Sequence, residues 1–130
     1  MARRLRVFVV EDSEMIRRRI VDNLGAICHC DVVGYAESAS EAVEAIRNTR
    51  PDVIITDIRL KQGNGIEVLR QVRADDMAPR PRVFVLTNYD YPEYRAQCSA
   101  AGADAFFDKS QEYELFLSKL QRLCPNGVSA

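Results

Sequence analysis

Three acidic residues lie where carboxylates are costly to place. Glu11 and Asp12 come directly after the apolar run Val7–Val10, and Asp57 follows a second apolar run, Val53–Thr56. Paired acids at the end of a core strand repel each other and resist desolvation, so either water screens them in a loop or a cation lies between them. Mg²⁺ suits such a site, because it prefers one or two carboxylates and completes its shell with water and phosphate oxygens.

A hydroxyl and an amine follow two further apolar runs and would complete a site for phosphoryl chemistry. Thr87 ends the run Val83–Leu86, and Lys109 comes shortly after Ala105–Phe107. Asp57 is the candidate for a carboxylate that attacks phosphorus and becomes an acyl phosphate, while the lysine and the threonine bind the phosphoryl oxygens. Taken singly, each residue also fits a solvated loop acid, a strand-end hydroxyl or a surface charge, so the prediction depends on their joint placement.

The segments between these groups predict the elements that position them. Strands are predicted at residues 5–10, 31–35, 53–56, 83–86 and 105–107, and helices at 16–27, 38–46, 66–72, 92–101 and 112–123. Ser38, followed three residues later by Glu41, is a capping-box start for the second helix. This alternation predicts an α/β domain with a five-stranded parallel sheet and helices on both faces. Ligands of such sheets bind outside the carboxyl ends of the strands, so all five polar groups are expected at one rim.

Length and composition limit the function classes. A chain of 130 residues with 47% hydrophobic and 28% charged residues predicts one globular domain. A net charge of −1 gives no reason to expect a nucleic acid or membrane partner, and the first apolar run is too short for a signal peptide or a span, so we expect a cytoplasmic protein. Cys28, His29 and Cys30 lack the spacing of a zinc motif, and the four cysteines are expected to be reduced thiols.

Four segments, VVEDSE, ITDIRLKQGNG, VFVLTN and GADAFFDKS, occur in an order and spacing that resemble the receiver domains of two-component response regulators, the CheY-like superfamily. The resemblance covers residues 5 to about 123. It implies a flavodoxin-like sheet in the order 2-1-3-4-5 and phosphorylation of Asp57 by a sensor histidine kinase or phosphotransfer protein. We expect a receiver domain over residues 1–124 and a short tail over residues 125–130.

The same resemblance implies a role for each polar residue. The Mg²⁺ ligands would be Asp12, Asp57 and the backbone carbonyl of Arg59, with Glu11 acting through water. Thr87 and Lys109 would contact the phosphate, and Phe106 matches the position of an aromatic switch. Phosphate would draw Thr87 inward and leave space for this ring, which carries no hydroxyl that burial would leave unsatisfied.

Several residues depart from the pattern of that family. Lys61 and Ser110 stand where proline is frequent, and a cis bond before Ser110, as in relatives, would cost about 3 kcal/mol. Arg59 and Tyr89, each two residues past a site residue, are bulky. We predict that they partly cover the phosphoryl group and slow attack by water.

Output is expected through binding, at the surface built by the helix at 92–101, the strand at 105–107 and the last helix. The aromatic candidates near this surface are Tyr91, Tyr94, Phe107 and Tyr113. A downstream protein target or a second copy of the chain, forming a homodimer, would bind there. Met15 and Arg19, beside the acid pair, are candidate kinase contacts that equally fit a solvated helix face.

Three other classes of protein stay open at this point. The first is a phosphatase or phosphotransferase that uses an aspartyl phosphate, but such enzymes place a second acid two residues after the nucleophile, where this chain has Arg59. The second is a receiver-like scaffold that never takes phosphate, and its usual mark, loss of a site residue, is absent from the sequence. The third, a flavodoxin-type nucleotide module, has only the GNG at residues 63–65 in its favour.

Overall fold

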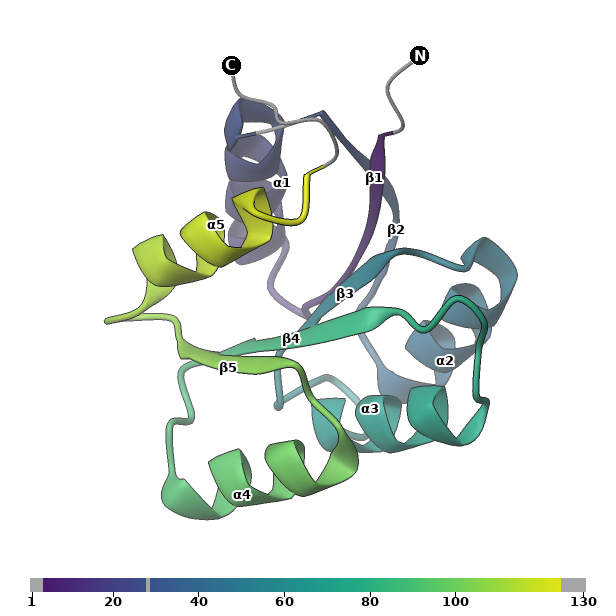
Figure 1. The fold of residues 1–130 in the computed structure, drawn as a ribbon. Helices are drawn as coiled ribbons and strands as arrows, with labels where there is room; N and C mark the ends of the chain where they lie inside the picture. The colour runs from purple at the N-terminus through teal and green to yellow at the C-terminus, as the bar shows by residue number, and fades with distance from the viewer. Residues whose placement is uncertain (1–3, 28, 125–130) are drawn as a thin grey trace.

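Residues 4–27 and 29–124 are described by the structure, a computed structural model, and in them strands and helices alternate along the chain (Figure 1). The strands are β1 (Leu5–Val10), β2 (Cys30–Ala36), β3 (Val53–Thr56), β4 (Arg82–Thr87) and β5 (Ala105–Asp108). The helices are α1 (Glu14–Ile27), α2 (Ala39–Thr49), α3 (Gly65–Ala74), α4 (Pro92–Ala101) and α5 (Tyr113–Gln121). Neighbouring strands pair in parallel in the order β2-β1-β3-β4-β5, which confirms the predicted fold class.

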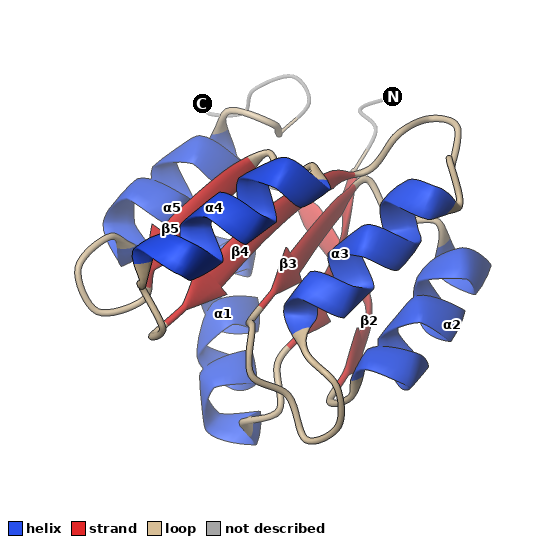
Figure 2. Ribbon diagram, turned by 90° about the horizontal axis from the view of Figure 1, so that it is seen from below, coloured by secondary structure: helices blue, strands red, loops and turns tan. Residues whose placement is uncertain are grey.

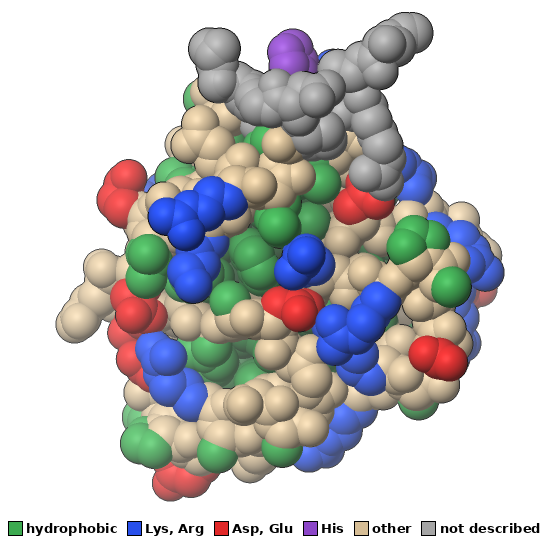
Figure 3. Space-filling model, viewed as in Figure 1, with side chains coloured by type: hydrophobic (Ala, Val, Ile, Leu, Met, Phe, Trp, Pro, Cys, Tyr) green, Lys and Arg blue, Asp and Glu red, His purple; other side chains and the backbone are tan. Residues whose placement is uncertain are grey.

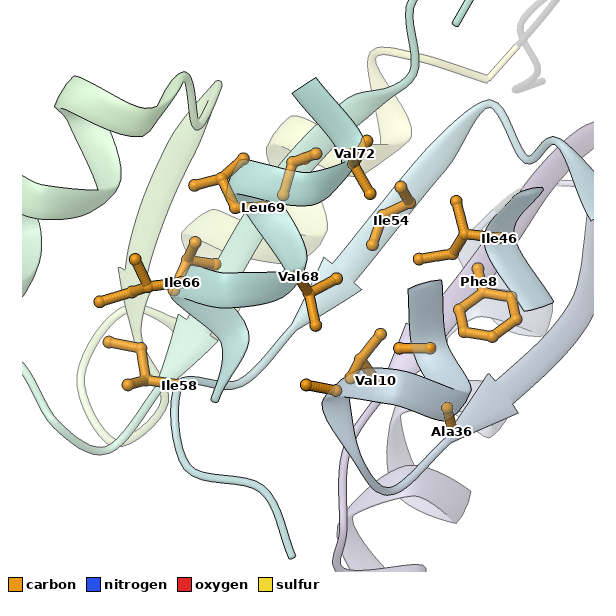
Figure 4. Packing of buried hydrophobic residues seen from close by; sticks show 14 of the residues in the cluster. Phe8, Val10, Ala36, Ile46, Ile54, Ile58, Ile66, Val68, Leu69 and Val72 are labelled. Carbon is orange, nitrogen blue, oxygen red and sulfur yellow. The ribbon is translucent and has the colours of Figure 1, made fainter. Parts of the chain in front are cut away.

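The helices cover both faces of the sheet, with α2, α3 and α4 on one side and α1 and α5 on the other (Figure 2). Each face has its own apolar cluster. Phe8 and Val10 belong to the cluster that includes residues of α2 and α3 (Figure 4), whereas Val7 and Val9 belong to the cluster that includes residues of α1 and α5. Successive residues of β1 therefore point to opposite faces, which explains why this strand is apolar from Val7 to Val10.

Helix ends follow the local signals in the sequence. The Ser38 hydroxyl accepts a hydrogen bond from the Glu41 N–H, which confirms the predicted cap of α2. Asn64 caps α3 in the same way, by accepting from the Glu67 N–H at 2.9 Å. Gly102 ends α4 with a φ of 101°, a left-handed conformation that glycine adopts without strain.

The last helix is shorter than predicted. Helix α5 begins after Glu112 and ends before Arg122, so it stops two residues short of the predicted end. Leu115 is 47% exposed, whereas Phe116 and Leu120 are fully buried. The face of α5 that packs against the sheet is therefore defined by Phe116 and Leu120, four residues apart.

The cysteines are not all reduced thiols as predicted, because Cys124 is disulfide-bonded. Cys98 is a free thiol with 1% exposure, and burial raises its pKa to about 11. Cys28 and the predicted tail, residues 125–130, lie outside the described residues. Within residues 4–27 and 29–124, each helix is too short or too polar to cross a lipid bilayer.

Candidate functional site

The side chain of Lys109 joins two buried carboxylates. Its Nζ atom lies 2.7 Å from Glu11 Oε1 and 2.7 Å from Asp57 Oδ2, and the three side chains are 9%, 3% and 7% exposed. These residues are 98 and 52 positions apart in the sequence from Lys109. The prediction that Glu11, Asp57 and Lys109 share one rim of the sheet is confirmed by these contacts.

Strand order explains why these residues meet. Strands β1 and β3 are adjacent, and the Asp57 N–H donates to Val10 O at 3.0 Å just past their paired ends. Strand β5 lies beside β4, and the Lys109 N–H donates to Thr87 O at 2.9 Å. Lys109 therefore leaves the edge strand two strands away from β3, and its long side chain reaches back across the end of β4 to Asp57.

Burial and charge act in opposite directions on this cluster. Burial raises the pKa of Glu11, and the hydrogen bond and charge of Lys109 only partly oppose the rise. For Lys109, burial lowers the pKa, but the charges and hydrogen bonds of Asp57 and Glu11 outweigh it, so the pKa is raised. Lys109 is therefore held as an ammonium ion. The sequence suggested that either water or a cation lies between the acids. In the structure, the Lys109 ammonium ion lies between Glu11 and Asp57.

The loop after β3 holds Asp57 by its main chain. Asp57 Oδ1 accepts from the Ile58 N–H at 2.6 Å, and the Thr56 hydroxyl donates to Asp57 O at 2.9 Å. Gly65 approaches the same carbonyl so closely that a Cβ atom would lie 1.9 Å from it. The glycine is required here because α3 begins against the main chain of the candidate phosphoacceptor.

The role of the GNG segment was missed in the sequence, where it counted only as a faint nucleotide-binding signal. Gly63 has a φ of 73°, Asn64 caps α3, and Gly65 fits against Asp57. The useful signal was an N-cap asparagine between two glycines, shortly after the strand-end acid. The segment positions Asp57, so it needs no ligand to explain it.

Asp12 and Thr87 lie at the same ends of β1 and β4 as predicted, but in different surroundings. Thr87 is fully buried, and its Oγ1 accepts from the Tyr89 N–H at 3.1 Å. Asp12 is half-buried and forms no hydrogen bond or ion pair with the residues that the structure describes. Among the predicted metal ligands, Asp12 is thus the carboxylate not engaged by another side chain.

The chemistry of the donors at this rim fits a magnesium ion. Carboxylates of Glu11, Asp12 and Asp57 and a main-chain carbonyl of the Arg59 loop are hard oxygen ligands of the kind Mg²⁺ prefers. Over the described part of the chain, no three His, Cys, Asp or Glu side chains already form a cluster able to hold a metal ion. A metal would therefore share the rim with Lys109, which already contacts two of these carboxylates.

A buried arginine beside the acid pair was not predicted. Arg17, on α1, is 9% exposed and donates to Glu11 O at 2.9 Å and to a Glu37 carboxylate oxygen at 3.1 Å. Its guanidinium also lies 4.0 Å from the ring centre of Tyr35. Lys61, which stands where relatives often have proline, pairs with the same Glu37 at 2.6 Å. Together these contacts fix the main chain at the end of β1.

Two other departures from the family pattern have visible roles. The Arg59 guanidinium lies over the Tyr89 ring, 4.7 Å from its centre, so the two bulky residues contact each other across the ends of β3 and β4. The Lys109–Ser110 peptide bond is trans. Ser110 donates from both its N–H and its hydroxyl to Asp108 Oδ1, at 2.8 and 2.7 Å, and these bonds hold the loop after Lys109.

The aromatic residues expected near α4, β5 and α5 do not all face outward. Phe107 is 2% exposed and packs edge-on against Phe84 and Phe116, so its prediction as a surface residue is wrong. Tyr91 is 55% exposed, and its ring lies 5.7 Å from that of Tyr94. Phe107 is buried beneath α5. Since side chains alternate along a strand, Phe106 lies on the opposite side of the sheet, which α4 covers.

The fold and this rim match a known family. The model of the response regulator receiver domain matches residues 7–121, which is most of the chain. The chain therefore belongs to the response regulator receiver domain family, and the resemblance inferred from the four sequence segments is confirmed.

Individual relatives agree with this assignment. The chain is 41% identical over 105 residues to the DNA-binding transcriptional activator DevR/DosR of Mycobacterium tuberculosis, covering 81% of this chain and 48% of that protein. The signal receiver domain of the putative response regulator NarL from Mycobacterium tuberculosis is 27% identical, with a TM-score of 0.83 over 92% of this chain and 94% of that one.

A more distant structure shares the fold alone. The CheX–CheY complex with BeF₃ and Mg²⁺ from Borrelia burgdorferi contains a chain that is 20% identical, with a TM-score of 0.82 over 92% of this chain and 88% of that one. The chain described here spans about half the length of the curated relatives it matches, 48% and 50% for the first two.

Proposed function

We propose that this receiver domain, over residues 1–124, accepts a phosphoryl group on Asp57 from a sensor histidine kinase or phosphotransfer protein in a reaction that depends on Mg²⁺. The single observation that carries the proposal is the bridge from Lys109 to Asp57 and Glu11, 2.7 Å at each contact, at the carboxyl ends of three parallel strands. A buried carboxylate with an ammonium ion on one oxygen lies where a phosphoryl group would find both a nucleophile and a counter-charge.

The residues of this chain divide the reaction between them. An Asp57 oxygen forms a bond to phosphorus while the bond from phosphorus to the donor imidazole nitrogen breaks, and the electron pair stays with the imidazole. The contact of Asp57 Oδ1 with the Ile58 N–H, at 2.6 Å, and that of Oδ2 with Lys109 orient the carboxylate. Lys109 then exchanges a carboxylate oxygen for a phosphoryl oxygen, and Thr87 supplies a hydroxyl.

The metal would be held by Asp12, Asp57 and the carbonyl of Arg59, with Glu11 acting through water. When bound, Mg²⁺ neutralises charge on the transferring group. A structural relative is described as a complex with BeF₃ and Mg²⁺, which supports this part of the proposal by analogy.

Phosphorylation would switch the surface of α4, β5 and α5 and so control a downstream protein or a second copy of this chain. The domain acts in the cytoplasm and turns over no substrate other than its own phosphoryl group. For the residues described here we propose no direct contact with nucleic acid or membrane, since the net charge of −1 offers no basic footprint.

The test is incubation with a small phosphodonor and Mg²⁺, followed by intact-mass analysis. We expect one added phosphoryl group on the wild type and none on Asp57→Asn. Asp22→Asn, an exposed acid on α1, is the matched control and should be modified like the wild type. Phosphorylation of Asp57→Asn, or sustained hydrolysis of a phosphomonoester by the wild type, would count against the proposal.

A further inference from the structure

A single guanidinium connects the three elements of the proposed output surface. Arg95, in the first turns of α4, lies 4.5 Å from the ring centre of Phe106 on β5. Its Nη2 atom is 3.0 Å from Glu112 Oε1, at the start of α5, and its Nε pairs with Asp90, just before α4. Charged side chains of both signs lie close together along the edge between α4 and α5 (Figure 3).

The Glu112 carboxylate extends this connection toward the site. Its Oε1 atom accepts from the Asp108 N–H at 2.9 Å as well as from Arg95, and the Glu112 N–H donates to Asp108 O at 2.7 Å. Asp108 is the last residue of β5 and directly precedes Lys109. Arg95 on α4 is therefore connected to Lys109 in the site through Glu112 and Asp108.

Phe106 lies in the path of any change at Thr87. It pairs in register with Val85, two residues before Thr87, and it is half-buried against the cluster that contains Val85. The ring and the threonine thus face the same side of the sheet. The Arg95 guanidinium lies over this ring from α4, so we expect a turn of the ring toward Thr87 to change this contact.

We propose that Arg95 is a positioning residue that clamps Phe106 and the start of α5 in the arrangement seen here, and that activation has to release this clamp. The inference rests on the proposed function only in taking the phosphorylated form as the opposing state. A clamp that stabilises one of two states shifts the population away from the other. Its removal should therefore favour the inward ring even without phosphate.

The experiment places a single 4-fluorophenylalanine at position 106 and records its fluorine NMR signal. The variants are Arg95→Gln, which removes the charge, Arg95→Lys, which keeps the charge without the planar fork, and Glu112→Gln, which keeps an acceptor for the Asp108 N–H. The control is Arg47→Gln, because Arg47 pairs with Asp75 at 2.7 Å and is 49% exposed against 40% for Arg95, but lies on α2, away from this surface.

In Arg95→Gln we expect the free signal to move toward the position that the wild type reaches with beryllofluoride and Mg²⁺. The solvent isotope shift of the fluorine between H₂O and D₂O should fall, because the ring becomes more buried. Arg95→Lys and Glu112→Gln should give smaller changes, and Arg47→Gln none. The apparent affinity of Arg95→Gln for beryllofluoride should rise about threefold to tenfold, the effect of losing one or two partly exposed contacts of this kind.

The two proposals fail in different ways. A wild type whose signal and mass are unaffected by phosphoryl analogues and donors would overturn the proposed function, and the clamp would then be judged on the free protein by the isotope shift alone. If Arg95→Gln leaves that shift at the wild-type value, or raises it, the clamp is wrong. An equal change in Arg47→Gln would also overturn it, since the effect would then follow from loss of any paired arginine.

Discussion

Gly65 lies against the main-chain carbonyl of Asp57 with no room for a side chain, because a Cβ atom would lie 1.9 Å from that oxygen. Gly65→Ala should therefore push the start of α3 away from Asp57 and lower the free energy of unfolding by about 1–3 kcal/mol. Gly25→Ala is the control: nothing lies within 4 Å of its added Cβ, and alanine within α1 should stabilise by about 0.5–1 kcal/mol. Urea unfolding measures both, and a neutral Gly65→Ala would contradict the geometry.

Lys109→Met should leave Glu11 and Asp57 buried without a counter-charge. We expect a loss of about 3–5 kcal/mol in unfolding free energy near pH 8, because removing one member of a buried ion pair leaves the charge of the other member uncompensated. The loss should shrink as the pH falls toward 5. Without the lysine, the folded-state pKa of Glu11 rises further, and a carboxyl with a raised pKa contributes stability at low pH that is lost as the pH increases.

The control for this pH series is Lys119→Met, an exposed lysine of α5. It should change stability little at either pH, since a surface charge contributes little. A deficit for Lys109→Met that stays constant or grows on acidification would mean that the two acids do not depend on Lys109 for neutralisation.

Arg17 and Arg18, adjacent on α1, allow a matched test of the buried contacts that Arg17 makes with Glu11 and Glu37. Arg17→Met removes the donor to Glu11 O and the partner of Glu37, and should cost about 1–3 kcal/mol because these acceptors lose their hydrogen bonds. Arg18→Met removes only a pair with Glu14 in which both side chains are more than half exposed, at 77% and 66%, and should cost little. Chemical denaturation measures the unfolding free energy of both variants. Equal losses would show that the buried contacts of Arg17 do not stabilise the fold.

The contact between Arg59 and Tyr89 predicts the lifetime of the phosphorylated form, given the proposed function. Replacing both residues with alanine should expose the phosphoryl group to water and raise the rate of dephosphorylation about tenfold, roughly 1.4 kcal/mol of barrier. The rate follows from loss of the added mass over time after the donor is removed. Arg82→Ala, an exposed arginine at the opposite end of β4, should leave the rate unchanged. An unaltered rate in the double variant would exclude a covering role.

The sequence was most informative where a single strand end was enough. Glu11, Asp57 and Lys109 were found because each follows an apolar run, and parallel strands bring their carboxyl ends to one rim. Arg17 was missed because its partner Glu37 is 20 residues away, and nothing local distinguishes it from Arg18 beside it. Long-range side-chain pairing of this kind has no periodic signature.

The sequence also did not show which face of the sheet each phenylalanine of β5 occupies. Phe106 and Phe107 are adjacent, so alternation along the strand required them to face opposite sides of the sheet. Phe107 was nevertheless named near the output surface, whereas Phe106, the predicted switch residue, is the one that lies on the α4 side. Hydrophobicity alone did not separate them, because both faces of this sheet are covered by helices.

Lys109 has one more consequence, for conditions in which magnesium is scarce. Because this ammonium ion already pairs with the acids that follow β1 and β3, we expect the domain to remain folded without a dissolved ion. Given the proposed function, chelation of Mg²⁺ should therefore stop phosphorylation without unfolding the domain. On the same proposal, the folded domain should regain phosphorylation as soon as Mg²⁺ is restored, with no refolding step.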